Sequence, residues 1–385
     1  MRTITRTPLA CLIGTLLSAS AASASVLDDT KFNFGGYVKL DAIASNYSDG
    51  TLPSGNIGRD FYIPGLTPVG GNDEGTAFDM HARQTRFNFS SKTQLENGKS
   101  LATKIELDFM ATPNGDERVS NSYSPRLRIA TIEYDGWLFG QTWTTFQDVA
   151  VLPDTLDFIG ATDGTIFVRQ AMIRYSNGGF QIALENPETT VTPYGGGGRI
   201  VTDDNSVPDL VLRYTHKADW GHVSGAALVR QLAYDDGGLI DSTETAASFS
   251  ISAKFNIGKD DIKLMYNAGA GMGRYLGINT ANGAVINANG ELEAIDSSGG
   301  LIAYRHLWND QWRSTISYSW FEADNEVALT GMGVTETTSS VRVNAIYSPT
   351  KALSFGLEYS HAERELENGN DGDMDRLQFS AKYAF

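Results

Sequence analysis

Arginine and lysine recur at alternate positions in segments whose other positions are apolar. Lys104 precedes Ile105, and Arg342 lies between Val341 and Val343. A period of two places the two kinds of residue on opposite faces of a β-strand. A face that carries many such cations attracts and holds anions without covalent chemistry, as rings of basic side chains do in selective pores.

The same alternation across the chain defines a basic set on the polar face of the expected strands. The residues expected to contact solute are Lys39, Arg86, Lys104, Arg126, Arg128, Arg213, Arg230, Arg305, Arg313 and Arg342. The same face also carries Lys254, Lys263, Arg376 and Lys382, and the acidic residues Asp41, Glu106, Asp108 and Glu358. These cations either meet a solute or pair with acidic residues and stiffen the wall. Arg169 and Arg174 lie on one expected strand with opposite parity, so alternation places only one of them on this face.

The segment of residues 147–165 is more apolar than a free surface loop. It contains Val149, Val151, Leu156, Phe158 and Ile159. A loop folded into a barrel would bury these groups and narrow the passage. Its acidic residues would then face the basic wall across a constriction, and these are Asp148, Asp154, Asp157 and Asp163. The alternative is a loop that packs on a neighbouring subunit.

Patterns for catalysis or cofactor binding are weak in this sequence. The five histidines are scattered and make no metal-ligand spacing. The run Gly195–Gly198 is followed by Arg199 and lacks the Lys-Ser/Thr of a phosphate-binding loop. No G-x-S-x-G motif is present, although residues distant in sequence could still form a catalytic triad. We therefore expect no cofactor and no enzymatic activity.

The alternating segments come in pairs joined by short turns, and long polar loops separate the pairs. Short turns are expected at residues 95–99, 135–136, 177–179, 219–221, 258–260, 308–310 and 348–350. Long connections are expected at residues 48–76, 113–124, 147–165, 187–207, 234–242, 273–296, 324–335 and 363–372. Asn-Gly and Asp-Gly steps suit the left-handed conformation that tight hairpin turns require. These 15 connections imply 16 strands.

A barrel of 16 strands encloses a lumen too wide to be filled by side chains. The apolar face must then look outward to lipid, and the polar face lines a water-filled channel. The sequence thus predicts an all-β fold. It is a 16-stranded antiparallel transmembrane β-barrel with short periplasmic turns, long extracellular loops and an inward-folded third loop.

The two ends of the chain agree with this placement. Residues 376–385 alternate between polar and apolar side chains and end on Phe385, which resembles the C-terminal signature of bacterial outer-membrane barrels. The alternative is a half-buried strand of a soluble β-sandwich. Residues 1–24 have a basic start, a short apolar core and a small-residue cleavage site, which predicts a cleaved signal peptide. Residues 25–385 are expected to form one barrel domain.

Composition excludes several classes of protein. The chain has 385 residues, 30 basic against 46 acidic, and a net charge of −16. Removal of the signal peptide with its two arginines leaves 28 basic residues and a charge of −18. This acidic excess argues against a nucleic-acid partner. No segment after residue 24 is long and apolar enough for a transmembrane helix, whereas a barrel needs apolar residues only at alternate positions.

Several motifs resemble those of the DcaP-like trimeric outer-membrane porins. They are the first-strand segment Gly36–Ala42, the segments Arg83–Phe87 and Gly140–Phe146, and the following Leu152–Phe158. The resemblance covers essentially all of residues 25–385. It implies a homotrimer in the outer membrane of a Gram-negative bacterium, in contact with the lipid bilayer and lipopolysaccharide. It also implies a pore that the third loop constricts and that passes small organic anions such as dicarboxylates.

The function expected from sequence is that of an outer-membrane porin. It would form a water-filled channel for passive diffusion of small hydrophilic solutes and would prefer organic anions. The alternatives are a porin specific for sugars or other solutes, an outer-membrane barrel enzyme, and an adhesin. A sugar channel would carry an aromatic stripe along its lumen, whereas the expected lumen here is mostly Arg, Lys, Ser and Thr.

Overall fold

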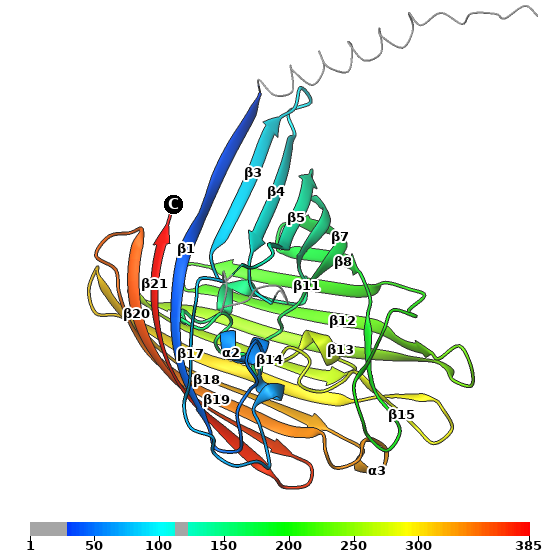
Figure 1. Cartoon of the computed structure of the whole chain (residues 1–385). Helices are drawn as coiled ribbons and strands as arrows, with labels where there is room; N and C mark the ends of the chain where they lie inside the picture. The colour runs from blue at the N-terminus through cyan, green and yellow to red at the C-terminus, as the bar shows by residue number, and fades with distance from the viewer. Residues whose placement is uncertain (1–28, 112–121) are drawn as a thin grey trace, which may run out of the picture.

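The computed structural model describes residues 29–111 and 122–385. The expected signal peptide, residues 1–24, lies outside the described residues, as does most of the expected connection 113–124. Antiparallel strands curve into one continuous wall (Figure 1). The wall strands are β1 (Thr30–Tyr47), β3 (Arg86–Gln94), β4 (Ser100–Asp108), β5 (Arg126–Tyr134), β6 (Trp137–Trp143), β7 (Arg169–Asn177), β8 (Phe180–Glu185), β11 (Asp209–Ala218), β12 (Gly221–Asp235), β13 (Asp241–Ile257), β14 (Asp260–Ala270), β17 (Asp296–Leu307), β18 (Trp312–Asp324), β19 (Thr335–Tyr347), β20 (Leu353–Leu366) and β21 (Asp371–Ala384).

The wall closes because β1 pairs with strands from both ends of the chain. Residues Tyr37–Tyr47 of β1 pair with β21, and residues Thr30–Tyr37 pair with β3. A further short strand, β2 (Ala77–His81), pairs with residues Asp41–Ser45 of β1. β2 and β3 thus occupy one position in the wall, so the 17-stranded sheet is a barrel of 16 positions. The expected 16-stranded antiparallel barrel is confirmed.

Alternation sets the two faces of the wall as the sequence predicts. On β21, Leu377 and Phe379 are exposed on the outside, whereas Arg376, Gln378 and Ser380 are 2% exposed or less. Side chains that are polar and buried can only point into the barrel, where other protein groups cover them. The outward face is therefore the apolar one, which is typical of a wall that lies in lipid.

All seven expected short turns join neighbouring strands. Two expected long loops are short, because their flanking strands extend into them. Only residues 236–240 separate β12 from β13, and only residues 367–370 separate β20 from β21. These strand ends are polar on both faces, so the apolar alternation that marks a strand in sequence is lost there. We refer to the two ends of the barrel as the turn end and the loop end.

Several loops fill part of the barrel interior. The loop after β14 contains η3 (Gly273–Tyr275), β15 (Ala284–Ile286) and β16 (Leu292–Ala294), and the loop after β8 contains β9 (Thr189–Thr192) and β10 (Ile200–Thr202). Strands β10, β9, β15 and β16 form a separate four-stranded sheet. Smaller elements are α2 (Ile57–Asp60), η1 (Pro64–Leu66), η2 (Val149–Val151) and α3 (Val327–Thr330). Among the described residues, no helix is long and apolar enough to span a membrane.

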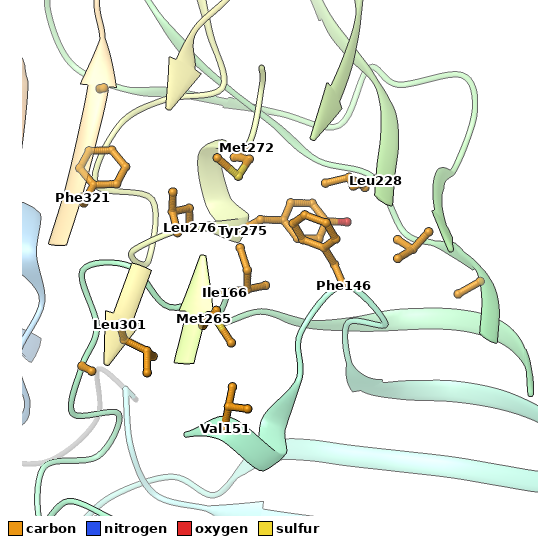
Figure 2. Packing of buried hydrophobic residues seen from close by; sticks show 14 residues of the cluster. Phe146, Val151, Ile166, Leu228, Met265, Met272, Tyr275, Leu276, Leu301 and Phe321 are labelled. Atoms are coloured by element: carbon orange, nitrogen blue, oxygen red, sulfur yellow. The ribbon is translucent and has the colours of Figure 1, made fainter. Parts of the chain in front are cut away.

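The interior has an apolar core to which the loop after β14 contributes as well as the third loop, and only the burial of the third loop was expected from sequence. Figure 2 shows Phe146, Ile166, Tyr275 and Leu276 gathered with side chains of the wall strands. The ring centroids of Phe146 and Tyr275 are 6.1 Å apart, in an edge-on arrangement. Burial of such side chains stabilises loops that would otherwise be mobile. The core therefore fixes two inward-folded segments, residues 147–165 and the loop after β14.

Candidate functional site

The third loop, residues 147–165, is attached on one side to strands β1, β20 and β21. Glu358 accepts hydrogen bonds from the backbone N–H groups of Leu156 (2.8 Å) and Asp157 (3.2 Å). The Leu156 carbonyl in turn accepts from Lys39 Nζ (2.6 Å) and Gln378 Nε2 (3.1 Å). Because these three wall residues are buried, the contacts lie inside the barrel.

The same loop is attached to strands β11–β14 on another part of the wall. Arg213 donates to the Gln147 carbonyl (2.6 Å), and Lys263 donates to the Leu152 carbonyl (2.7 Å). Only a loop inside the barrel can reach both groups of strands. The expected inward-folded third loop is thus confirmed.

The four acidic residues expected at the constriction occupy different environments. Asp148 accepts hydrogen bonds from His222 Nε2 (2.7 Å) and Ser252 (2.8 Å). Burial raises the pKa of Asp148, but these hydrogen bonds outweigh burial and lower the pKa overall. Asp157 accepts from the N–H groups of Ile159 and Gly160 in its own loop and from that of Tyr62 in the loop after β1, at 3.0–3.2 Å.

Asp163 and Asp154 are the other two. Asp163 is fully buried and accepts from Tyr62 Oη (2.7 Å) and from the Ser340 hydroxyl. Burial raises the pKa of Asp163 despite these hydrogen bonds. Asp154 pairs with Arg313 at 2.6 Å, and its side chain is 29% exposed. Asp154 is thus the most accessible carboxylate of the four, and the other three mainly fix the loop.

Five cations and two carboxylates meet on strands β3–β7. We call this group the arginine cluster, and its members are Arg86, Lys104, Arg126, Arg128 and Arg169 with Glu106 and Asp108. Arg128 is buried and bridges both carboxylates, at 2.8 Å from Glu106 and 2.6 Å from Asp108. Arg126 makes two hydrogen bonds of 2.9 Å with Asp108. Arg86 (3.5 Å) and Lys104 (3.3 Å) approach Glu106.

Among the described residues, Arg169 is the member of the arginine cluster for which no carboxylate partner is seen. Its guanidinium lies 4.5 Å from the centre of the Trp143 ring and 5.7 Å from that of Phe167. Within residues 29–111 and 122–385, no carboxylate lies within 4 Å of it. The faces of the two rings attract the cation. Arg169 is the first residue of β7 and pairs with Trp143 of β6. The spacing of residues in the sequence does not reveal such a contact between neighbouring strands.

A second group of cations borders a cavity of about 240 Å³ beside the third loop. Lys39, Arg86, Arg313 and Lys382 line this cavity together with Asp154 and other loop residues. Lys39 also contacts Asp41 at 3.0 Å. Arg86 belongs to both groups, so the arginine cluster and this cavity adjoin each other.

The remaining expected residues are held away from these two groups. Arg230 is buried, lies 3.4 Å from Asp209 and donates to the Gly271 carbonyl (3.1 Å). Arg342 is 1% exposed, 3.7 Å from Glu358 and stacked over the Tyr62 ring.

Arg305 and Arg213 complete the set. Arg305 pairs with Asp261, and Arg213 is joined to the third-loop backbone as described above. The structure therefore brings six of the ten expected cations together, namely Lys39, Arg86, Lys104, Arg126, Arg128 and Arg313. The other four support loops or the wall.

The pair Asp154–Arg313 allows a selective test of the constriction. Asp154→Asn should make the channel more anion-preferring, because Arg313 then loses its neutralising partner. The effect on stability should stay below about 1 kcal/mol, since both side chains are more than a quarter exposed. Reversal potential in a salt gradient measures the preference, and heat-induced loss of the folded barrel measures stability.

Asp310→Asn provides a control with the same change in charge, because Asp310 is exposed on the turn after β17. An equal shift in both variants would mean that Asp154 does not act at the constriction.

The fold and the site can now be compared with known proteins. The model of the DcaP outer membrane protein family matches residues 18–385. The chain belongs to the DcaP outer membrane protein family. No curated protein matches the chain. Membership and fold together make it an outer-membrane porin, which confirms the resemblance seen in the motifs.

Solved structures of outer-membrane channels agree with the DcaP assignment. The outer membrane channel DcaP of Acinetobacter baumannii is 22% identical, with a TM-score of 0.77 over 93% of this chain and 98% of that one. The anion-selective porin from Comamonas acidovorans is 9% identical, with a TM-score of 0.54 over 92% and 100%. The trimer form of OmpT from Vibrio cholerae is 12% identical, with a TM-score of 0.54 over 93% and 100%. At these identities the likeness establishes the fold.

Proposed function

We propose that this DcaP-family porin is a passive channel that prefers small organic anions, dicarboxylates among them. The observation that carries the proposal is the arginine cluster, in which five cations face two carboxylates beside the third loop. A net positive group in a partly desolvated passage lowers the energy of an anion more than it would in bulk water. The interior charge thus opposes the net charge of −16 of the whole chain.

The chemistry of the cluster suits carboxylates in particular. Guanidinium groups bind carboxylates through two parallel hydrogen bonds, as Arg126 does with Asp108. A solute carboxylate can form the same geometry with Arg169, whose guanidinium is stacked on Trp143 and has no carboxylate within 4 Å among the described residues. The similarity to an anion-selective porin supports this proposal at the level of the fold.

The proposal includes the assembly and export of the protein. A homotrimer in contact with outer-membrane lipid and lipopolysaccharide is favoured by the motifs of the family and by a trimeric form among the similar structures. Cleavage of residues 1–24 and passive transport without an enzymatic step are part of the same proposal. We also propose that residues 25–385 form one domain.

Reversal potential in a planar bilayer tests the proposed selectivity. In a gradient of potassium chloride the wild-type channel should favour chloride, and added succinate should reduce chloride current. Arg169→Gln should lower the ratio of anion to cation permeability, because it removes a positive charge that no carboxylate of the described residues neutralises.

Lys259→Gln is the matched control, because Lys259 lies exposed in the turn before β14. That variant should keep the wild-type ratio. A wild-type channel that favours potassium would contradict the proposed function.

A further inference from the structure

A second cavity, of about 230 Å³, lies at the loop end of the barrel. Four connections border it, namely those after β1, β8, β14 and β18, and the outer part of β20 completes it. In Figure 1, β15 and α3, which belong to two of these connections, lie near each other at one end of the barrel. The cavity is separate from the arginine cluster, and none of its lining residues belongs to the cluster.

Two arginines face this cavity, and neutral groups hold both of them in place. Arg199 donates from Nε to Asn282 Oδ1 (2.6 Å) and from a terminal nitrogen to the Asn279 carbonyl. Arg364 donates from Nε to Thr335 Oγ1 (3.0 Å) and from a terminal nitrogen to the Thr67 carbonyl (3.0 Å). In the described part of the chain, each guanidinium keeps one terminal nitrogen without an acceptor. These nitrogens can donate to a ligand.

Within the part of the chain that the structure describes, no carboxylate compensates the charge of either arginine. Of residues 29–111 and 122–385, no carboxylate lies within 4 Å of either guanidinium, and no Asp or Glu lines the cavity. Glu367 does not line the cavity, but it accepts a hydrogen bond of 2.8 Å from Asn325, which does. Exposed acidic residues are common elsewhere on this end, as at Asp203, Asp204 and Asp236. A cavity free of carboxylates is therefore a local exception on the acidic loop surface.

The glycine run before Arg199 contributes to this arrangement. Gly195 donates to the Leu329 carbonyl at 2.6 Å, which joins the run to α3. Gly196 has a φ of 95°, and a Cβ there would lie 2.7 Å from the Thr330 carbonyl oxygen. A larger side chain would push the run away from α3 and would move Arg199 with it. The run thus serves to position a cation, which gives it a role that its sequence alone did not suggest.

We propose that this cavity is an outer binding site for a small dissolved carboxylate, which it captures before the solute reaches the arginine cluster. The inference rests on the proposed anion preference and extends it to the loop end. Two arginines with free donor nitrogens, three asparagines and a carboxylate-free lining supply the chemistry that recognises such a group. A positive cavity in an acidic surface raises the local concentration of anions and speeds their entry.

Cysteine labelling of the folded, full barrel tests the proposed site. Ala281 lines the cavity, and Ala281→Cys changes little in size. The one native cysteine, Cys11, is replaced by serine in all variants. We expect an anionic methanethiosulfonate to react faster with this cysteine than a cationic one does. The ratio of the anionic to the cationic rate should be about 10-fold higher than the same ratio for a free thiol in solution. Added succinate should slow the reaction.

Charge variants make the labelling result specific. Arg199→Gln with Arg364→Gln should reduce the ratio of the two rates to that of a free thiol and abolish the effect of succinate. Arg199→Lys with Arg364→Lys should keep most of the ratio, because the charges remain. Arg199→Gln alone, at an exposed position, should give an intermediate ratio even where the double variant fails to fold.

A control position lies on the acidic surface nearby. Leu239 is fully exposed in the turn between β12 and β13, beside Asp235 and Asp236, so Leu239→Cys should react faster with the cationic reagent. A rate ratio at Ala281→Cys that is unchanged by the loss of both arginines would overturn the outer site.

Reversal potential separates this outcome from failure of the proposed function. The double glutamine variant should keep its anion preference, because the arginine cluster is intact. Cation preference in the wild type would refute the proposed function, whereas an anion-preferring channel with an unchanged labelling ratio would refute only the outer site.

Discussion

Glu358→Ala should release the third loop and raise the conductance of the channel. The substitution removes the acceptor for the backbone N–H groups of Leu156 and Asp157 and for the Asn344 amide. It also leaves Arg342, 1% exposed, without its carboxylate at 3.7 Å. Loss of one partner from a buried ion pair costs about 3–5 kcal/mol. The variant should therefore lose the folded form at a lower temperature as well.

Two further variants distinguish release of the loop from general damage to the wall. Glu358→Gln keeps the size of the side chain and one acceptor oxygen. Its conductance and its unfolding temperature should therefore lie between those of the wild type and those of Glu358→Ala. Leu357→Ala changes the neighbouring residue on the lipid-facing side, where it is 50% exposed. It should leave conductance unchanged. Conductance of wild-type size in Glu358→Ala would mean that other contacts suffice to hold the loop.

Arg128→Gln should combine a large loss of stability with a loss of anion preference. Arg128 is 2% exposed and bridges Glu106 and Asp108, so its removal leaves two buried carboxylates with weaker partners. We expect a cost of about 3 kcal/mol. The interior also loses one positive charge, which lowers the permeability ratio of anions to cations.

Arg126→Gln is the natural comparison for this prediction. It removes the same charge from the same cluster, but the Arg126 side chain is 25% exposed. Its cost in stability should be clearly smaller, while its shift in reversal potential should be similar. Heat-induced unfolding and reversal potential of the two variants give both quantities. Equal stabilities would show that burial of the Arg128 pairs does not matter to the fold.

The barrel could be predicted from sequence because the period of two is long and regular. Residues such as Leu377 and Phe379 face lipid along the whole membrane span, so alternation there reflects one constant environment. The prediction was less accurate at the loop end. Residues 363–366 and 371–372 extend strands β20 and β21 beyond the apolar belt, where both faces are polar and alternation disappears.

The site could be predicted in part, and its limits have physical causes. The inward third loop was recognisable because Val151, Leu156 and Ile159 require burial. The loop after β14 also folds inward, but its contacts with β9 and with the end of the third loop depend on pairings that are distant in sequence. The alternation of residues predicts which face of the wall a side chain is on, but not which residue it contacts there. It therefore could not distinguish the buried Arg342 from the accessible Arg313.

The pairing of β1 with β21 has a consequence for how the barrel folds. The strands that close the wall lie more than 300 residues apart, and their pairing ends in reciprocal hydrogen bonds of 3.1 Å between Gly36 and Phe385. Until β21 arrives, the sheet has two unpaired edges that can join other chains. Pairing at such a distance in sequence is slow. We therefore expect closure to be a slow step of folding, and a chaperone that covers β1 until then should protect the protein from aggregation.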